Sequence, residues 1–109
     1  MRFFGKYRFE KNRHHINPAL LWEYDLETFD FQASRRIVAE RVIQIGRLSD
    51  WFAAFDLYGG ISGFRKMAKM EVEDLDDRNL DFMCLALNLK KENTRCYKSK
   101  QLHLQRLTS

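Results

Sequence analysis

Apolar residues recur at helical spacing in four successive segments of this chain, and this pattern restricts its fold more than any other feature. In the first segment, Ile37, Val38, Val42 and Ile45 fall on one stripe, as on a helix that buries one face. The other three segments are 48–58, 61–70 and 76–88. One Pro and five Gly in the whole chain argue against a turn-rich sandwich or barrel. The pattern predicts an all-α fold, a compact bundle of four to five short helices with basic N- and C-terminal arms.

Turn-forming and capping residues separate these segments. Asn17 before Pro18 predicts a short helical turn, which Leu21 and Trp22 are expected to anchor to the core. After a loop at 25–30, we expect the first long helix over 31–45. Further caps are predicted at Gly46 in left-handed conformation after this helix, Ser49 before the second helix, Gly59 or Gly60 after it, Asp76 before the fourth helix and Asn88 after it. The segment 76–88 is apolar nearly all round, so it is expected to be the most buried element.

Charge is distributed unevenly along the chain and defines its predicted organisation. Residues 1–15 hold five basic residues and one acidic residue, and residues 89–109 hold six and one. Residues 16–88 hold eight basic and thirteen acidic residues. We therefore expect a basic aromatic arm over 1–15 and a single helical domain over 16–109 with a basic C-terminal segment. The arm is an edge strand, a disordered segment or a segment that orders on a partner, and the C-terminal segment is a final helix or frays.

Two further patterns bear on the cellular compartment. No apolar run approaches the ~18 residues that a membrane span needs, and no continuous apolar segment follows the basic start as it would in a secretory signal. Cys84 and Cys96 lack a C-x-x-C pattern, so we expect reduced thiols. These patterns predict a cytoplasmic protein with no membrane partner.

Arg41 is the residue that most clearly separates a structural from a functional interpretation. It lies on the apolar stripe of the first helix, four positions after Ile37 and four before Ile45. A buried guanidinium needs a carboxylate or carbonyl oxygens as partners. The candidate carboxylates are those of Glu23, Asp25 and Asp56. We favour a structural ion pair with Glu23 or Asp25 that ties the segment 20–25 to the helix; the alternative is an anion site for the phosphate of a nucleotide or nucleic acid.

The Gly59-Gly60 pair resembles the tight turn of a helix-turn-helix motif. On this interpretation, 61–70 is a recognition helix. The nucleic-acid contacts would then be Arg65, Lys66, Lys69, Lys98 and Lys100. A plain helical hairpin with solvated basic residues is favoured, because the acidic run at 71–77 would repel DNA.

The sequence lacks the patterns that are typical of common catalytic and metal sites. His14 and His15 are adjacent rather than four residues apart, and no ligand cluster accompanies them. The acidic run at 71–77 has no EF-hand spacing and is interpreted as a capping loop. Cys96 lies among basic residues that favour a lowered pKa, but no base stands beside it in the sequence. No P-loop, GxGxxG or GxSxG motif occurs, so we expect no metal, no cofactor and no enzymatic activity.

Several motifs between residues 20 and 101 form a recognisable series. They are Trp22-Glu23, the I-x-x-R-V-like helix at 37–42, Gly46, Asp50-Trp51, Tyr58-Gly59, the leucine-rich stretch 80–89 and Arg95-Cys96-Tyr97. In this series the chain resembles an uncharacterised family of small bacterial all-helical proteins that are often encoded beside nucleotidyltransferase-like toxins. The helix motif matches that family from Val38 onward and is one residue wider from Ile37. The resemblance implies an antitoxin-like or accessory role by association, and it places Arg41 among residues that set the fold.

The residue patterns and the family resemblance together lead to one main hypothesis and one alternative. The main hypothesis is a non-enzymatic helical protein-binding module, an antitoxin-like neutraliser or regulator of a partner protein such as a toxin encoded nearby. The expected partner contacts are Phe3, Phe4, Tyr7 and Phe9. The alternative is a DNA-binding transcriptional regulator that uses the hairpin around Gly59-Gly60. A homodimer is a further expectation, because a chain of 109 residues buries only about 60–65% of its unfolded surface.

Overall fold

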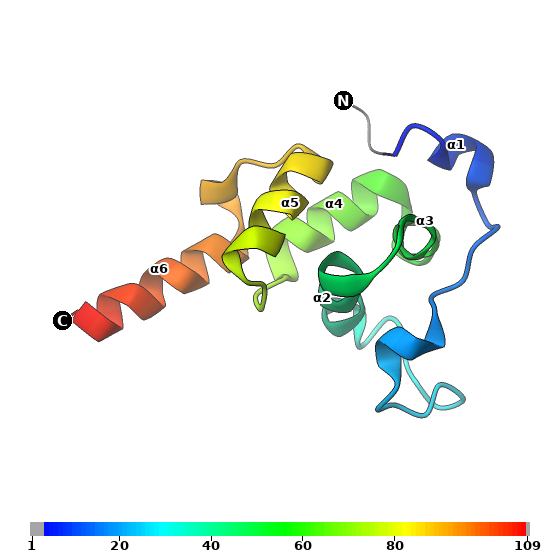
Figure 1. The fold of residues 1–109 in the computed structure, drawn as a ribbon, viewed down its shortest axis with the longest axis horizontal. Helices are drawn as coiled ribbons and strands as arrows, with labels where there is room; N and C mark the ends of the chain where they lie inside the picture. Colours follow the sequence, from blue (N-terminus) through cyan, green and yellow to red (C-terminus); the bar gives the residue numbers. More distant parts are fainter. Residues whose placement is uncertain (1–3, 109) are drawn as a thin grey trace.

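The computed structural model describes residues 4–108 and shows an all-helical protein, as predicted, with no strand among the described residues (Figure 1). These residues form six α-helices, one or two more than the sequence predicts. In chain order the elements are α1 (Tyr7–Glu10), the 3-10 helix η1 (Pro18–Leu21), α2 (Arg35–Ile45), α3 (Leu48–Leu57), α4 (Gly60–Glu71), α5 (Asp77–Leu87), the 3-10 helix η2 (Lys91–Asn93) and α6 (Arg95–Thr108). None of these helices is both long and apolar enough to cross a membrane.

Helix α3 forms the centre of the core. Trp51, Phe52 and Phe55 are all buried, and the Phe55 ring lies 5.4 Å from the ring of Phe64 on α4. The expectation that 76–88 would be the most buried element is therefore wrong. On α5, the side chain of Leu85 is 70% exposed, because one face of this helix packs against the core and the opposite face meets solvent.

The buried face of α2 differs from the predicted stripe by a rotation of the helix. Val38 and Val42 are fully buried, as predicted, but Ile45 is exposed.

The helix begins at Arg35 rather than at residue 31, because the Asp30 carboxylate accepts hydrogen bonds from two successive backbone N–H groups and forms a turn.

Gly46 follows α2 in an extended conformation with φ −74°, so the left-handed cap predicted there is wrong. The glycine is required for a steric reason. A Cβ atom at Gly46 would lie 2.6 Å from the backbone oxygen of Val42, closer than any side chain can approach a carbonyl without a shift of the backbone.

Three of the predicted caps are confirmed. The Asn17 side chain accepts from the N–H of Ala19 at the start of η1, and Asp76 accepts from the N–H of Asn79 at the start of α5. Asn88 ends α5 in the left-handed conformation, with φ 55°. Short-range pairs of this kind depend on two or three neighbouring residues, which explains why sequence alone predicts them.

The cap predicted at Ser49 is wrong, since Ser49 lies inside α3 and its neighbour Asp50 takes that role. The buried Asp50 carboxylate accepts from the N–H of Arg47 at 2.9 Å. Its other oxygen accepts from the N–H of Asn17 at 2.9 Å, across 33 residues. One carboxylate therefore caps α3 and holds the start of η1 against it. Of the two predicted anchors of η1, Leu21 is buried, whereas the side chain of Trp22 is 79% exposed.

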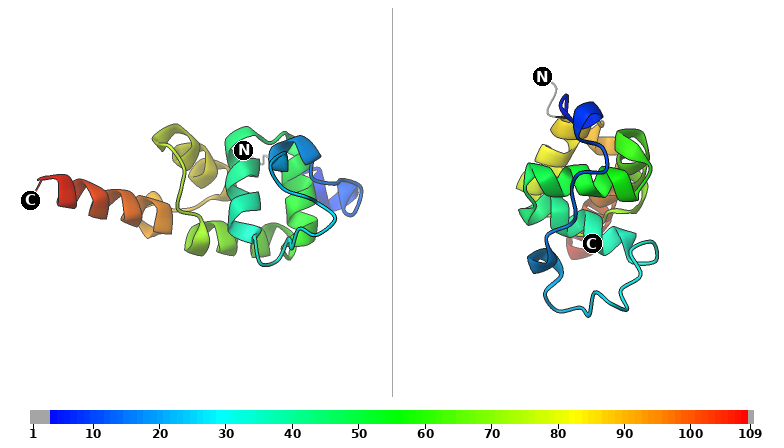
Figure 2. Two further views of the ribbon diagram at one scale, coloured as in Figure 1. Left: turned by 90° about the horizontal axis from the view of Figure 1, so that it is seen from below. Right: turned by 90° about the vertical axis from the view of Figure 1, so that its right-hand side faces the viewer.

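Helix α6 leaves the bundle. Figures 1 and 2 both show it pointing away from the other helices, and it contributes to a longest dimension of 49 Å against a shortest of 19 Å. Its first turn packs against α4 and η2 through the fully buried Cys96. Of the two outcomes left open for the C-terminal segment, the structure shows the helix.

Candidate functional site

Arg41 lies beside the buried face of α2 rather than within it. Its side chain is 29% exposed, so the expectation of a cation in the middle of a buried stripe is wrong. Its Nη1 atom donates to the carboxylate of Glu23 at 2.6 Å and to the carbonyl oxygen of Leu20 at 2.8 Å. The contact therefore joins α2 to the end of η1 through a half-exposed ion pair.

The other two candidate partners of Arg41 are engaged elsewhere, and this corrects the pairing proposed for Asp25. The Asp25 carboxylate accepts from the N–H of Glu27 within its own loop at 3.0 Å, the geometry of an Asx turn. Asp56 accepts from the Tyr7 hydroxyl at 2.6 Å and from the N–H of Asn12 at 2.9 Å. The structure thus gives Arg41 one carboxylate, that of Glu23.

The N-terminal aromatic residues divide into two groups, and the expectation that all of them form a partner-binding arm is wrong. Phe4 is buried, with its ring 5.1 Å from that of Trp51 and 4.9 Å from that of Phe55. Tyr7 is buried too and hydrogen-bonds to Asp56. Phe9 is 65% exposed, and Phe3 lies outside the described residues. Phe4 and Tyr7 therefore belong to the core of the domain and hold the segment 4–10 against it.

Burial raises the pKa of Tyr7 from its usual 10.0 to about 12, and the hydrogen bond and negative charge of Asp56 add to this effect. The neutral phenol is the form that fits this site, because ionisation would place two negative charges side by side. The Tyr7–Asp56 contact is therefore a structural hydrogen bond across 49 residues.

The turn between α3 and α4 has the conformation that its glycines allow. Gly59 and Gly60 both adopt positive φ, 87° and 79°, which side-chain-bearing residues rarely do. Figure 1 shows α3 almost end-on while α4 runs across the view, so the two helices cross steeply. A steep crossing after a glycine turn occurs in helix-turn-helix motifs and in ordinary helical hairpins.

The five basic residues considered for nucleic-acid contact lie in different settings. Arg65 is exposed, but its guanidinium is engaged within the protein: its Nε donates to the carbonyl oxygen of Leu87 at 2.7 Å and its Nη2 to that of Asn88 at 2.8 Å. It therefore closes the C-terminal end of α5, where free carbonyl groups need donors. On α4, Lys66 is exposed and Lys69 is half-buried. On α6, Lys98 is exposed, and the Nζ atom of Lys100 lies 3.4 Å from the Oδ1 atom of Asp77. The structure does not gather them on one helix face.

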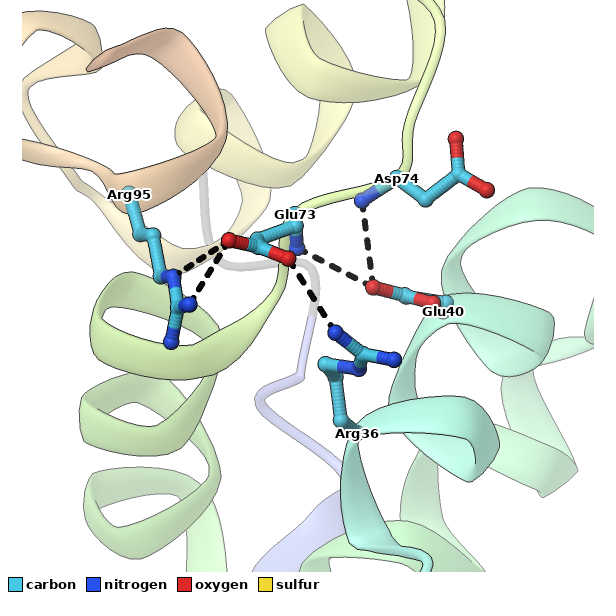
Figure 3. Close-up of polar contacts among 5 residues, drawn as sticks. All are labelled: Arg36, Glu40, Glu73, Asp74 and Arg95. Atoms are coloured by element: carbon cyan, nitrogen blue, oxygen red, sulfur yellow. Dashed lines mark hydrogen bonds and ion pairs between the residues drawn. The ribbon is translucent and has the colours of Figure 1, made fainter. Parts of the chain in front are cut away.

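The acidic run at 71–77, which the sequence predicts to be a capping loop, also joins several helices. Glu73 accepts from Arg95 of α6 at 2.7 Å and from Arg36 of α2 at 3.1 Å (Figure 3). The carboxylate of Glu40 on α2 accepts from the N–H groups of Glu73 and Asp74 at 3.0 and 3.1 Å. No group of three or more potential metal ligands occurs among the described residues. Glu73 therefore neutralises two arginines, and Glu40 binds two backbone N–H groups; neither carboxylate belongs to a cluster of metal ligands among the described residues.

The two cysteines are buried free thiols. Burial raises the pKa of Cys96, and the opposing effect of Lys100 is smaller. The expectation that basic neighbours lower this pKa is therefore wrong. Burial also raises the pKa of Cys84, so both thiols remain protonated and unreactive at neutral pH.

The exposed part of α6 is the least explained surface of the domain. We define the α6 surface as the side chains of Leu104 and Leu107, which lie three residues apart on one face of the helix. They are 52% and 68% exposed, whereas the exposed Leu102 lies on the opposite side of α6. Large apolar side chains exposed on a projecting helix are typical of binding surfaces. Sequence alone does not place these leucines in a site, because their exposure depends on the direction in which α6 leaves the bundle.

Comparison of the chain with curated proteins and with solved structures finds no match. Comparison with protein families does find a match, which extends from just before η1 into α4. The DUF6922 family, a family of unknown function, is recognised over residues 16–67.

Proposed function

We propose that this protein is a non-enzymatic protein-binding module that neutralises or regulates a partner protein in the cytoplasm. The observation that carries the proposal is the α6 surface, with Leu104 and Leu107 exposed on one face of a helix that projects from the bundle (Figure 1). An amphipathic helix that places its apolar face in a groove of another protein is a common mode of recognition.

The pattern along α6 supports this proposal. Leu107 follows the fully buried Cys96 by eleven residues, close to three helical turns, so both lie on nearly the same face. Leu104 follows the partly buried Tyr97 by seven residues, again on nearly the same face. The face that packs on the bundle in the first turn of α6 therefore continues outward through Lys100, which pairs with Asp77, to Leu104 and Leu107 in solvent. A partner that covers it would extend the existing core.

The resemblance to proteins encoded beside nucleotidyltransferase-like toxins suggests which partner to test first. We infer that the product of the neighbouring gene, when it is such a toxin, is bound and neutralised by this protein. The excess of basic residues at 89–109, six against one acidic residue, favours a partner with an acidic surface, because opposite charges accelerate association.

The experiment is co-expression of the protein with the neighbouring gene product, followed by size-exclusion chromatography with light scattering and by calorimetric titration. We expect a complex of fixed stoichiometry that L104E/L107E abolishes. The matched control is I45E/L48E, which adds the same two negative charges at exposed apolar residues of α2 and α3 outside the α6 surface. An unchanged complex with L104E/L107E, or no complex with the wild type, would overturn the proposal. A wild-type mass of two chains without partner, reduced to one chain in L104E/L107E, would instead indicate that a homodimer covers the α6 surface.

DNA binding is a second candidate, and one observation favours it. The described part of α6 that includes Arg95, Lys98, Lys100 and Arg106 holds no acidic residue, as in helices that contact phosphates. Fluorescence anisotropy with duplex DNA from upstream of the gene and with a scrambled duplex tests this. Preferential binding that persists at physiological salt supports regulation, whereas equal binding that salt abolishes indicates only non-specific attraction.

A further inference from the structure

A cavity of about 1260 Å³ opens between α1, the Gly59-Gly60 turn and the C-terminal end of α5. It lies apart from α6, whose residues are not among those that line it. Its apolar lining is formed by Phe4, Phe55, Ile61, Leu85 and Leu87. Leu85 is 70% exposed, so an occupant of the cavity would remove a large apolar side chain from water.

The charged residues that line the cavity are mostly cations. They are Arg8, Lys11 and Arg65, against the single carboxylate of Asp56 among the described lining residues. That carboxylate already accepts hydrogen bonds from the Tyr7 hydroxyl and the N–H of Asn12. The cavity is therefore electropositive, and the one negative charge in it is committed to the protein.

Arg65 is held in a fixed position at the cavity. Its Nε and Nη2 atoms donate to the carbonyl oxygens of Leu87 and Asn88, so these two bonds lock the guanidinium plane. A ligand carboxylate that binds to a guanidinium already held in place loses less side-chain entropy than one that must order a free arginine. The exposed side chains of Arg8 and Lys11 face the same space from the α1 side.

We propose that this cavity binds an acidic peptide segment in which Asp or Glu side chains alternate with large apolar ones. Apolar walls combined with convergent cations select an amphipathic anion rather than a simple inorganic one. The volume of about 1260 Å³ exceeds the roughly 300–1,000 Å³ that single small ligands occupy, and it suits several residues of a peptide. The site does not depend on the α6 surface or on the proposed function.

The test is selection of peptides on the purified full chain from a phage-displayed library of random sequences, at physiological salt. Selection is expected to enrich peptides rich in Asp and Glu with interspersed Leu, Phe or Ile. The strongest peptide, labelled for fluorescence anisotropy, should bind R8E/K11E at least tenfold more weakly than it binds the wild type. It should also lose affinity for L85N, which removes the apolar rim and leaves the charge unchanged.

The matched control is K66E/K98E, which makes the same change of charge at two exposed lysines that do not line the cavity. This control should bind the peptide as the wild type does, and L104E/L107E should too, because α6 is not involved. Thermal denaturation followed by circular dichroism verifies that each variant is folded. Enrichment of peptides without acidic residues, no enrichment at all, or an equal loss of binding in R8E/K11E and K66E/K98E would overturn the proposal.

Discussion

The guanidinium of Arg41 lies 2.6 Å from the carboxylate of Glu23 and ties helix α2 to the chain that follows η1. Both side chains are close to 30% exposed, 29% and 30%, so water screens the pair. E23Q should therefore lower the free energy of unfolding by only about 0.5–1 kcal/mol. R41M should cost about 1–2 kcal/mol, because the Leu20 carbonyl also loses its donor.

Urea denaturation of both single variants and of the double variant measures this coupling. A coupling energy of up to about 1 kcal/mol is expected. A loss of more than about 3 kcal/mol for E23Q would be typical of a buried pair and would contradict the half-exposed geometry.

Phe4 and Phe9 test whether the N-terminal segment belongs to the core. F4A should lower the free energy of unfolding by about 3–5 kcal/mol, the cost of a cavity left by a core phenylalanine. F9A, at a side chain that is 65% exposed, should cost less than about 0.5 kcal/mol. Chemical denaturation followed by tryptophan fluorescence measures both. Equal, small effects would show instead that this segment is a detached arm.

The raised pKa of Tyr7 predicts a loss of stability at alkaline pH. The unfolded chain releases this proton near pH 10, whereas the folded chain retains it until about pH 12. The stabilisation by the neutral phenol is thus complete below pH 10 and declines as the pH rises toward 12. Y7F should be less stable than the wild type at pH 8 by about 1–2 kcal/mol, because it loses the hydrogen bond to Asp56.

The same comparison at pH 11 should give a smaller difference between wild type and Y7F, since only the wild type has this tyrosine proton to lose. Denaturation curves at the two pH values measure the change. A difference that is constant or grows between pH 8 and pH 11 would contradict the buried Tyr7–Asp56 contact.

Arg65 and Lys66 are adjacent cations with different predicted roles. R65M should lower the free energy of unfolding by about 1–3 kcal/mol, because two carbonyl groups at the end of α5 lose charged donors. K66M, at an exposed position, should change it by less than about 0.5 kcal/mol. Thermal and urea denaturation distinguish them, and similar small losses in both variants would argue against the capping role of Arg65.

The features that sequence predicted well are local. Asn17, Asp76 and Asn88 were assigned correctly as helix ends, because each acts on backbone groups within a few residues. For segment 48–58 the helical period predicts a buried stripe of Leu48, Trp51, Phe52 and Phe55; the three aromatic residues are buried on α3, whereas Leu48 is exposed. Such signals carry their physical cause within one or two turns of chain.

The features that sequence missed depend on contacts between distant residues. The hydrogen bond of Tyr7 spans 49 residues to Asp56, and that of Arg65 spans 22 residues to Leu87. A cation near apolar residues, such as Arg65, has the same local pattern whether it caps a distant helix or faces DNA. The exposure of Leu85 and Leu107 likewise follows from where α5 and α6 lie, which periodicity does not encode.

The central claim is that the α6 surface binds a partner protein. The most direct measurement is amide hydrogen exchange by mass spectrometry on the full chain, alone and saturated with the neighbouring gene product. We predict that residues 101–107 of α6 exchange rapidly in the free protein and become strongly protected in the complex, while α3 is protected in both. Unchanged exchange across 101–107 in a saturated complex would contradict the claim and would move the binding surface elsewhere on the domain.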